Sequence, residues 1–292
     1  MKIGLLTNGF YRVGQTDFEW VCRWAAEHGF QEIEIGDTVE LDRRLFEQIQ
    51  SKGDIHLEAF LYCKNMLDPI DGDTYVEELK KRILLASQLE IPNVIAFTGF
   101  DLTPDTNEKN MRGHRPVADQ IDTVVERYKP IIELVEKYGI KLSFENCPMM
   151  GNIAYSPIIY QMLFEKMESQ KVGITLDPAH FVWTGVDPYR EILKFGQRIF
   201  HFHGKDCEID RMRLQETGIL ATRDWWHYRE PGLGELNWNK IVDCLNQVHY
   251  TGTISLEHDD TVWNTTKEKV AAGFLIGKKT IVSVPGFLPM GI

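Results

Sequence analysis

Eight short β-like segments recur along this chain of 292 residues, and a helix-like segment follows each of them. Such regular alternation predicts parallel strands joined by right-handed crossovers. Eight units in this length fit a closed (β/α)8 TIM barrel, for which about 250 residues is typical, and a doubly wound open sheet is the structural alternative. We therefore predict one α/β barrel domain over residues 1–292. The predicted strands are residues 2–7, 32–36, 54–62, 93–99, 141–146, 172–177, 198–203 and 252–257.

Two connections are long by the standards of compact domains. Residues 100–115 and 204–237 each follow a predicted strand, and connections of such length commonly serve a function. Because each follows a strand, both would lie at the carboxyl-terminal face of the barrel, where barrel enzymes build their active sites. The prediction is thus a barrel with a long loop after its seventh strand.

Charge and hydropathy exclude several classes of protein. The formal net charge of −11 argues against a nucleic-acid partner. No run of eighteen apolar residues is present, so we expect no membrane span. The first residues, MKIGLLTNGFYR, lack the features of a signal peptide, and the five cysteines form no C-x-x-C pair. A cytoplasmic protein with free thiols is the expectation.

Polar side chains share one face of the last four predicted strands. Side chains alternate across a strand, so Leu142 and Phe144 oppose Ser143 and Glu145. The segments VGITLD, RIFHFH and GTISLE repeat this pattern, with one apolar face and one small or polar face. Barrel interiors usually hold branched aliphatic residues, so a polar interior indicates a site. The polar faces end in Glu145, Asp177, His203 and Glu257.

These four ionisable residues predict a metal site. A single glutamate or histidine at a strand end is usually structural, but four in phase on successive strands favour a shared role. Three carboxylates cannot all stay ionised close together without a counter-charge. No Lys or Arg alternates into these strand ends in the same way, so we expect a divalent cation. Oxygen donors with one imidazole suit Mn²⁺, the ion we expect, or Mg²⁺, Co²⁺ or Fe²⁺.

The motifs SFEN, LDPAH, HFHGKD and LEHDD, in this order, resemble the xylose isomerase-like TIM barrel superfamily. This superfamily includes sugar isomerases, ketose 3-epimerases, inosose dehydratases and a branch of AP endonucleases. A closer similarity is to proteins of the sugar phosphate isomerase/epimerase type and to the barrel subunits of C-glycoside deglycosidases, which work with a second, smaller protein. The resemblance implies that Glu145, Asp177, His203 and Glu257 bind the metal, that the two glutamates are acid and base, and that His180 binds a substrate hydroxyl.

Further residues around this centre are candidates for contacts with the substrate. Trp183 can stack on the C–H face of a sugar ring, although a core position is equally expected. Lys205 and Asp206 directly follow the metal-binding histidine and can bind a hydroxyl or pair with each other. His56, on the third predicted strand, would line the mouth of the barrel.

The expected chemistry is proton abstraction next to a carbonyl. A metal that binds the carbonyl of a sugar acidifies the neighbouring carbon, and a carboxylate then removes the proton. Return of the proton gives an isomerase or epimerase of a sugar or keto-sugar. The alternative is a lyase or deglycosidase of 3-keto-glycosides, including C-glycosides, with an accessory subunit. A DNA-repair nuclease and a sugar-binding barrel without activity are the remaining alternatives, and the acidic charge opposes the nuclease.

The partners expected are a small sugar or glycoside, with no nucleic acid and no membrane. Residues 283–292, SVPGFLPMGI, form an apolar end. This end either docks on its own barrel or packs on a partner subunit, because an apolar segment is poorly solvated. A homo-oligomer is therefore expected, with a small accessory subunit as a further possibility.

Overall fold

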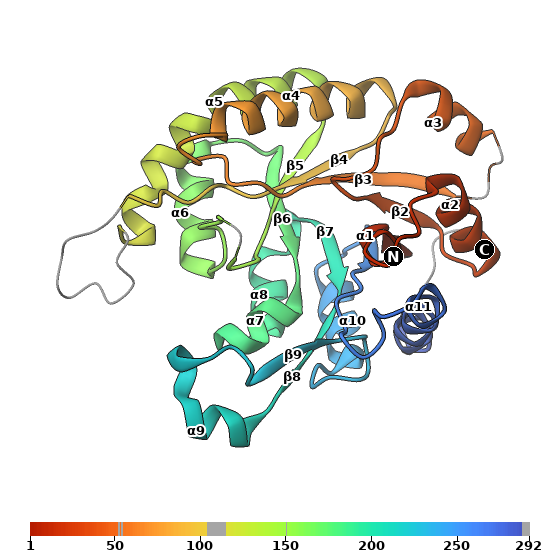
Figure 1. The fold of residues 1–292 in the computed structure, drawn as a ribbon. Coiled ribbons are helices and arrows are strands. Elements are labelled where there is room, and N and C mark those ends of the chain that lie inside the picture. Colours follow the sequence, from red (N-terminus) through yellow and green to blue (C-terminus); the bar gives the residue numbers. More distant parts are fainter. Residues whose placement is uncertain (52, 54, 104–114, 150, 288–292) are drawn as a thin grey trace. The chain divides into compact units, whose positions relative to one another are not determined.

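The computed structural model describes all residues except 52, 54, 104–114, 150 and 288–292 (Figure 1). All eight predicted strands are present. Their order is β1-β10-β7-β6-β5-β4-β3-β2, which is that of a closed barrel. The prediction of a (β/α)8 barrel is therefore confirmed. The chain divides into two compact units, residues 1–58 with 176–292, and residues 59–175.

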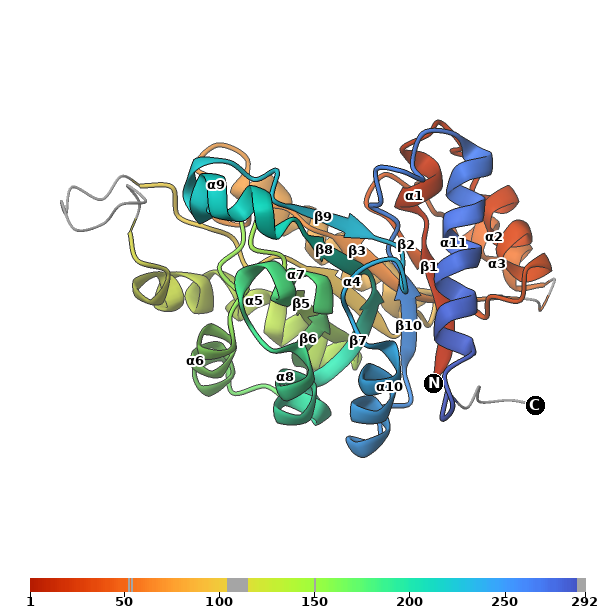
Figure 2. The same cartoon turned by 90° about the horizontal axis from the view of Figure 1, so that it is seen from below.

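The first unit contains most of the predicted site residues, on its strands or in the segments that directly follow them. Strand β1 pairs in parallel with β2 and β10, and β10 pairs in parallel with β7. Helix α11 packs along β1 and β10 (Figure 2). The elements are β1 (Lys2–Leu6), α1 (Asn8–Tyr11), α2 (Phe18–Glu27), β2 (Glu32–Ile35), α3 (Arg43–Gln50), α7 (Pro178–Thr184), α8 (Pro188–Phe195), η2 (Gly196–Arg198), β7 (Ile199–Gly204), α10 (Trp238–Gln247), β10 (Thr253–Leu256) and α11 (Lys267–Val282).

The second unit continues the alternation of strands and helices. Strand β4 pairs in parallel with β3 and β5, and β5 pairs in parallel with β6. Helix α5 runs through Pro130 to Tyr138, and Gly139, whose backbone is left-handed, caps its carboxyl end. Its elements are β3 (His56–Tyr62, of which residues 59–62 lie in this unit), α4 (Gly72–Gln88), β4 (Asn93–Ala96), η1 (Val117–Gln120), α5 (Ile121–Tyr138), β5 (Lys141–Glu145), α6 (Pro157–Met167) and β6 (Val172–Leu176, of which residues 172–175 lie in this unit).

The strand interiors carry the expected polar face. In β5 and β6, Leu142 and Phe144 are fully buried on one face, while the Ser143 and Thr175 hydroxyls on the other are 2.7 Å apart and hydrogen-bonded. In β7, His201 is fully buried, so its polar ring also lies inside. Buried polar groups need such partners because leaving them without one costs free energy.

The long connection after β7 is a folded excursion with elements of its own. It contains β8 (Asp206–Ile209), α9 (Arg211–Ala221) and β9 (Trp226–Arg229). Strands β8 and β9 form an antiparallel two-stranded sheet (Figure 2). Tyr228 of β9 lies opposite Cys207 of β8, and the centroid of its ring is 4.5 Å from Nζ of Lys205, the residue that follows β7.

Most of the other long connection, residues 104–114 of 100–115, lies outside the described residues, as do residues 288–292 of the apolar end. In the described part of that end, Val284 and Phe287 are buried, which matches docking of these residues on their own chain. No helix in the described part of the chain combines the length and the apolar character that crossing a membrane requires.

Candidate active site

Asp177, His203 and Glu257 converge at the carboxyl ends of three strands. Asp177 directly follows β6, His203 lies near the end of β7, and Glu257 directly follows β10. Their ligand atoms all lie within 4.8 Å of one another. The side chains of Asp177 and His203 are fully buried and that of Glu257 is 11% exposed. Two carboxylates and one imidazole are donors that fit a divalent metal ion.

The start of helix α7 orients Asp177. Its Oδ1 accepts a hydrogen bond from the Ala179 backbone N–H at 2.8 Å and so caps the helix. Pro178 occupies the first helical position, where its fixed backbone angle favours this turn. The other oxygen, Oδ2, lies 2.8 Å from Lys205 Nζ. One carboxylate oxygen therefore caps the helix, and the other faces the cluster formed by Asp177, His203, Glu257 and Lys205.

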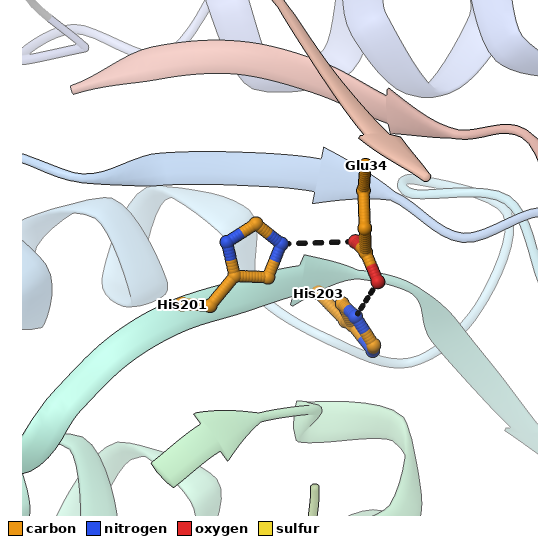
Figure 3. Close-up of side chains that lie close together, drawn as sticks. All are labelled: Glu34, His201 and His203. Carbon is orange, nitrogen blue, oxygen red and sulfur yellow. Dashed lines mark hydrogen bonds and ion pairs between the residues drawn. The ribbon is translucent and has the colours of Figure 1, made fainter. Parts of the chain in front are cut away.

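Glu34 on β2 contacts both histidines of β7 (Figure 3). His201 Nε2 lies 2.9 Å from Glu34 Oε2, and His203 Nε2 lies 3.2 Å from Glu34 Oε1. Burial acts to raise the pKa of Glu34, but the charges and hydrogen bonds of His203 and His201 outweigh it and lower that pKa. Glu34 is therefore ionised at neutral pH. Glu34 was not among the predicted site residues, although EIEIG shows the same alternation of apolar and polar side chains as the last four predicted strands.

Glu257 lies between an imidazole and an ammonium group. Its Oε2 is 2.8 Å from His203 Nδ1 and 2.9 Å from Lys205 Nζ. Burial acts to raise the pKa of Glu257, but the positive charges of Lys205 and His203 lower it well below its ordinary value. Glu257 is therefore a carboxylate at neutral pH.

Lys205 lies within the carboxylate cluster, which corrects the expectation that no lysine or arginine accompanies these strand ends. The residue is 1% exposed, and its Nζ also lies 3.4 Å from Asp259 Oδ2. Lys205 follows the last residue of β7 and keeps the register of the odd-numbered side chains, whereas the predicted strand stopped at residue 203. An ammonium group thus supplies part of the counter-charge that we had assigned to a metal alone.

The ion pairs around Lys205 leave room for a further positive charge. Asp259 pairs with Arg12 as well as with Lys205. Among these groups, the three carboxylates of Asp177, Glu257 and Asp259 are matched with two cationic side chains. The donor set therefore still fits a divalent cation, but such an ion would share the carboxylates with the ammonium group.

His180 joins the cluster to the excursion after β7. Its Nε2 lies 3.1 Å from Asp177 Oδ2, and its Nδ1 is hydrogen-bonded to the Tyr228 hydroxyl group at 2.8 Å. Tyr228 was not among the predicted site residues, although it shares a face of β9 with Trp226. Trp183 stacks on Trp226, with ring centroids 4.5 Å apart and an interplanar angle of 2°. Aromatic rings therefore do lie beside His180.

Asp206 holds the backbone of the excursion, away from Lys205 Nζ and its partners. Its Oδ1 accepts from the N–H groups of Cys207 and Leu236 at 2.8 and 3.0 Å. Its Oδ2 accepts from the Gly232 N–H and the Trp238 indole N–H at 3.0 and 2.9 Å. Four donors occupy the carboxylate, which gives Asp206 a structural role.

His56 does not line the mouth of the barrel. It is exposed and is the first residue of β3, at the amino end of that strand. Barrel sites form at the carboxyl ends, so this prediction is wrong. Glu145 is the last residue of β5, is 4% exposed and belongs to the second unit. Its Oε2 lies 3.8 Å from Cys63 Sγ, and its part in metal binding stays a prediction.

Residues 22–275 match the family model of the xylose isomerase-like TIM barrel. Protein YfiH from Bacillus subtilis is 27% identical over 299 residues, which covers 89% of this chain and 93% of that protein. An inosose dehydratase from Clostridium perfringens is 22% identical over 282 residues, which covers 91% of each chain.

Two solved structures have the same fold. The IolI protein with a bound zinc atom superposes with a TM-score of 0.71 at 18% identity, covering 97% of each chain. An L-ribulose 3-epimerase superposes with a TM-score of 0.69 at 18% identity, covering 96% of this chain and 95% of that one. At such identities the likeness establishes the fold alone.

Proposed function

Because this chain belongs to the xylose isomerase-like TIM barrel family, we propose that it is a divalent-metal-dependent isomerase or epimerase of a sugar or keto-sugar. The observation that carries the proposal is the convergence of Asp177, His203 and Glu257, whose ligand atoms lie within 4.8 Å of one another. We propose Glu145 as the fourth ligand. The zinc in the IolI structure supports metal binding but leaves the choice of ion open, with Mn²⁺ as our proposal.

The residues of the cluster have distinct proposed roles. A bound divalent ion supplies Lewis-acid polarisation of the substrate carbonyl. Glu257, ionised because of Lys205 and His203, accepts the proton from the carbon next to the carbonyl. Glu145 donates or accepts a proton on the opposite face of that carbon. The lowered pKa of Glu257 makes it a weak base, so the carbon must be acidified for the transfer to proceed. The Lys205 ammonium group donates a hydrogen bond to the oxygen on which negative charge develops.

Elimination is the second candidate reaction. A leaving hydroxyl or aglycone needs a proton donor, and the Tyr228 hydroxyl lies 2.8 Å from His180 Nδ1 beside the cluster. The similarity to an inosose dehydratase supports this candidate. In this form the substrate is a 3-keto-glycoside or keto-polyol. A small accessory subunit and a homo-oligomer remain proposals, which light scattering of the purified protein tests.

One experiment separates the two reactions. The purified protein is incubated with a keto-sugar panel and a 3-keto-glucoside in heavy water, and the products are followed by NMR, with elemental analysis of the protein alongside. Deuterium incorporation without fragments supports the isomerase or epimerase, whereas loss of water or release of an aglycone supports the lyase. Glu257→Gln is expected to abolish either change, and Glu235→Gln, at a glutamate that pairs with Arg211 outside the cluster, is expected to retain it. A protein that holds no metal and exchanges no proton would contradict both.

A further inference from the structure

Glu34 uses both carboxylate oxygens on the two histidines of β7, one oxygen for each ring (Figure 3). The side chains of Glu34, His201 and His203 are all fully buried. A buried carboxylate in this position is costly unless it is hydrogen-bonded. Neither the proposed proton transfer nor the proposed ligand set requires Glu34, so its presence beside them needs a separate explanation.

The direction of these hydrogen bonds follows from chemistry. An ionised carboxylate only accepts, so each imidazole must present its Nε2–H group to Glu34. A neutral imidazole that carries its proton on Nε2 has its lone pair on Nδ1. The Nδ1 atom of His203 lies 2.8 Å from Glu257 Oε2 and so faces the cluster. While no metal is bound, the contact with the Glu257 carboxylate also calls for a proton on Nδ1. When a metal replaces that proton, Glu34 keeps the other proton on Nε2, and the Nδ1 lone pair is free to bind the metal.

We propose that Glu34 is a positioning residue that holds His203 as the Nε2–H tautomer and aims its Nδ1 at the metal centre. The inference rests on the proposed metal-dependent function. It adds Glu34 on β2, a strand that carries none of the proposed metal ligands. His201 supports the arrangement because it donates to Oε2 at 2.9 Å and fixes the carboxylate plane. Carboxylate partners of this kind orient the histidine ligands of metal sites and raise their basicity.

A second metal ion is the competing explanation for the same three residues. Glu34, His201 and His203 lie close enough together to hold an ion. Such an ion would need both Nε2 atoms as lone-pair donors, and His203 would then have to bridge two cations through one ring. The hydrogen bonds of 2.9 and 3.2 Å already satisfy Glu34 without an ion, which favours positioning.

The test compares Glu34→Gln with Glu32→Gln. Glutamine has one acceptor oxygen and one donor amide group, so it cannot accept from both rings. Glu32 lies two residues earlier on the same face of β2, is 1% exposed and pairs with Lys2, so it is a matched control. Mn²⁺ is titrated calorimetrically into each metal-free protein. Long-range ¹H–¹⁵N NMR spectra of the imidazoles report the tautomers, and circular dichroism with thermal melting checks the fold.

We expect the wild type to bind one Mn²⁺ per chain, and His203 to keep its proton on Nε2 both in the metal-free protein and with diamagnetic Mg²⁺ bound. Glu34→Gln should bind Mn²⁺ about 10- to 100-fold more weakly and show a mixture of tautomers, whereas Glu32→Gln should match the wild type within about twofold. Unchanged affinity and tautomer in folded Glu34→Gln would overturn the proposal. Two ions per wild-type chain, with one lost in Glu34→Gln, would instead make Glu34 a ligand.

The tautomer measurement separates this inference from the proposed function. If the wild type bound no metal but His203 carried its proton on Nε2 only while Glu34 was present, the metal-dependent function would fail and the positioning of the ring would stand. If metal bound normally while His203 carried its proton on Nδ1, the function would stand and the positioning role would fail.

Discussion

Lys205 Nζ lies 2.9 Å from Glu257 Oε2 and 2.8 Å from Asp177 Oδ2, so a buried ammonium group links two carboxylates that we assign to a metal. The cluster is thus partly neutralised by the chain itself. An ion that binds there competes with Lys205 for the same oxygens, which makes metal affinity and the stability of the metal-free protein depend on one side chain.

Lys205→Met should therefore act in opposite directions on these two properties. Removing one partner of a buried ion pair typically costs about 3–5 kcal/mol, so the metal-free variant should unfold at lower temperature. Mn²⁺ should bind at least about tenfold more tightly, because the ammonium group no longer competes, and should raise the melting temperature more than in the wild type. Lys81→Met, at an exposed lysine paired with Glu78, is the control. Equal Mn²⁺-induced shifts in Lys205→Met and wild type would contradict the competition.

Tyr228→Phe should distinguish the two candidate reactions. The variant loses the hydroxyl group that lies 2.8 Å from His180 Nδ1 but keeps the ring. If the protein catalyses elimination, we expect the rate of elimination to fall by about 100-fold or more, since general-acid assistance is worth about that much. Deuterium incorporation and Mn²⁺ affinity should stay within about twofold. An equal loss of exchange and elimination would argue against a proton-donor role.

Asp206→Asn should loosen the excursion after β7 without changing the metal site. The carboxylate accepts four hydrogen bonds, two on each oxygen. In asparagine one of these oxygens becomes an NH₂ group, which cannot accept, so the two N–H groups on that side lose their acceptor. Leaving buried donors without acceptors costs about 1–3 kcal/mol. Faster amide hydrogen exchange at Gly232 and Leu236 is the expected result. Unchanged exchange together with a loss of substrate affinity would restore Asp206 as a substrate ligand.

The pH dependence of stability should carry a contribution from His258. The residue is 1% exposed, and burial lowers its pKa to about 4. Its pKa in the unfolded chain is about 6.5, so the unfolded state binds the proton first and the free energy of unfolding falls as the pH drops from about 6.5 to 4. Between pH 6.5 and 4, the free energy of unfolding falls by about 3 kcal/mol because of this residue, and above pH 6.5 the residue has no effect of this kind. Urea unfolding at several pH values should show that the free energy of unfolding of His258→Asn depends less on pH than that of the wild type. Exposed His227→Asn is the control, and equal slopes in His258→Asn and wild type would contradict the assignment.

The barrel and the convergence of three site residues could be predicted because the signals are local. Alternation of side chains over four to six residues separates the two faces of a strand, and each strand end follows from the same pattern. Asp177, His203 and Glu257 were found in this way, and their ligand atoms do lie together. Glu34 carries the same signal in EIEIG, so the local pattern is sufficient to predict this residue as well.

The remaining features depend on contacts between segments that are distant in the chain. Asp206 has a structural role because of donors 26–32 residues away, and no local pattern predicts them. Lys205 was predicted only as a possible partner of a substrate hydroxyl or of Asp206, and its place among the carboxylates was not predicted, because β7 extends one residue beyond the predicted strand and carries the alternation on to the lysine. His56 was misplaced because it begins β3, and a residue that begins a parallel strand of a barrel lies at the end opposite the catalytic face.

The central claim is that one divalent ion is shared by side chains from successive strands. Its most direct test is calorimetric titration of Mn²⁺ into the metal-free wild type and into Glu145→Gln, Asp177→Asn, His203→Gln and Glu257→Gln, with Glu235→Gln as the control. We predict one ion per wild-type chain, at least about tenfold weaker binding in each of the four variants, and unchanged binding in the control. A wild type that binds no ion, or four variants that bind it as tightly as the wild type, would contradict the claim.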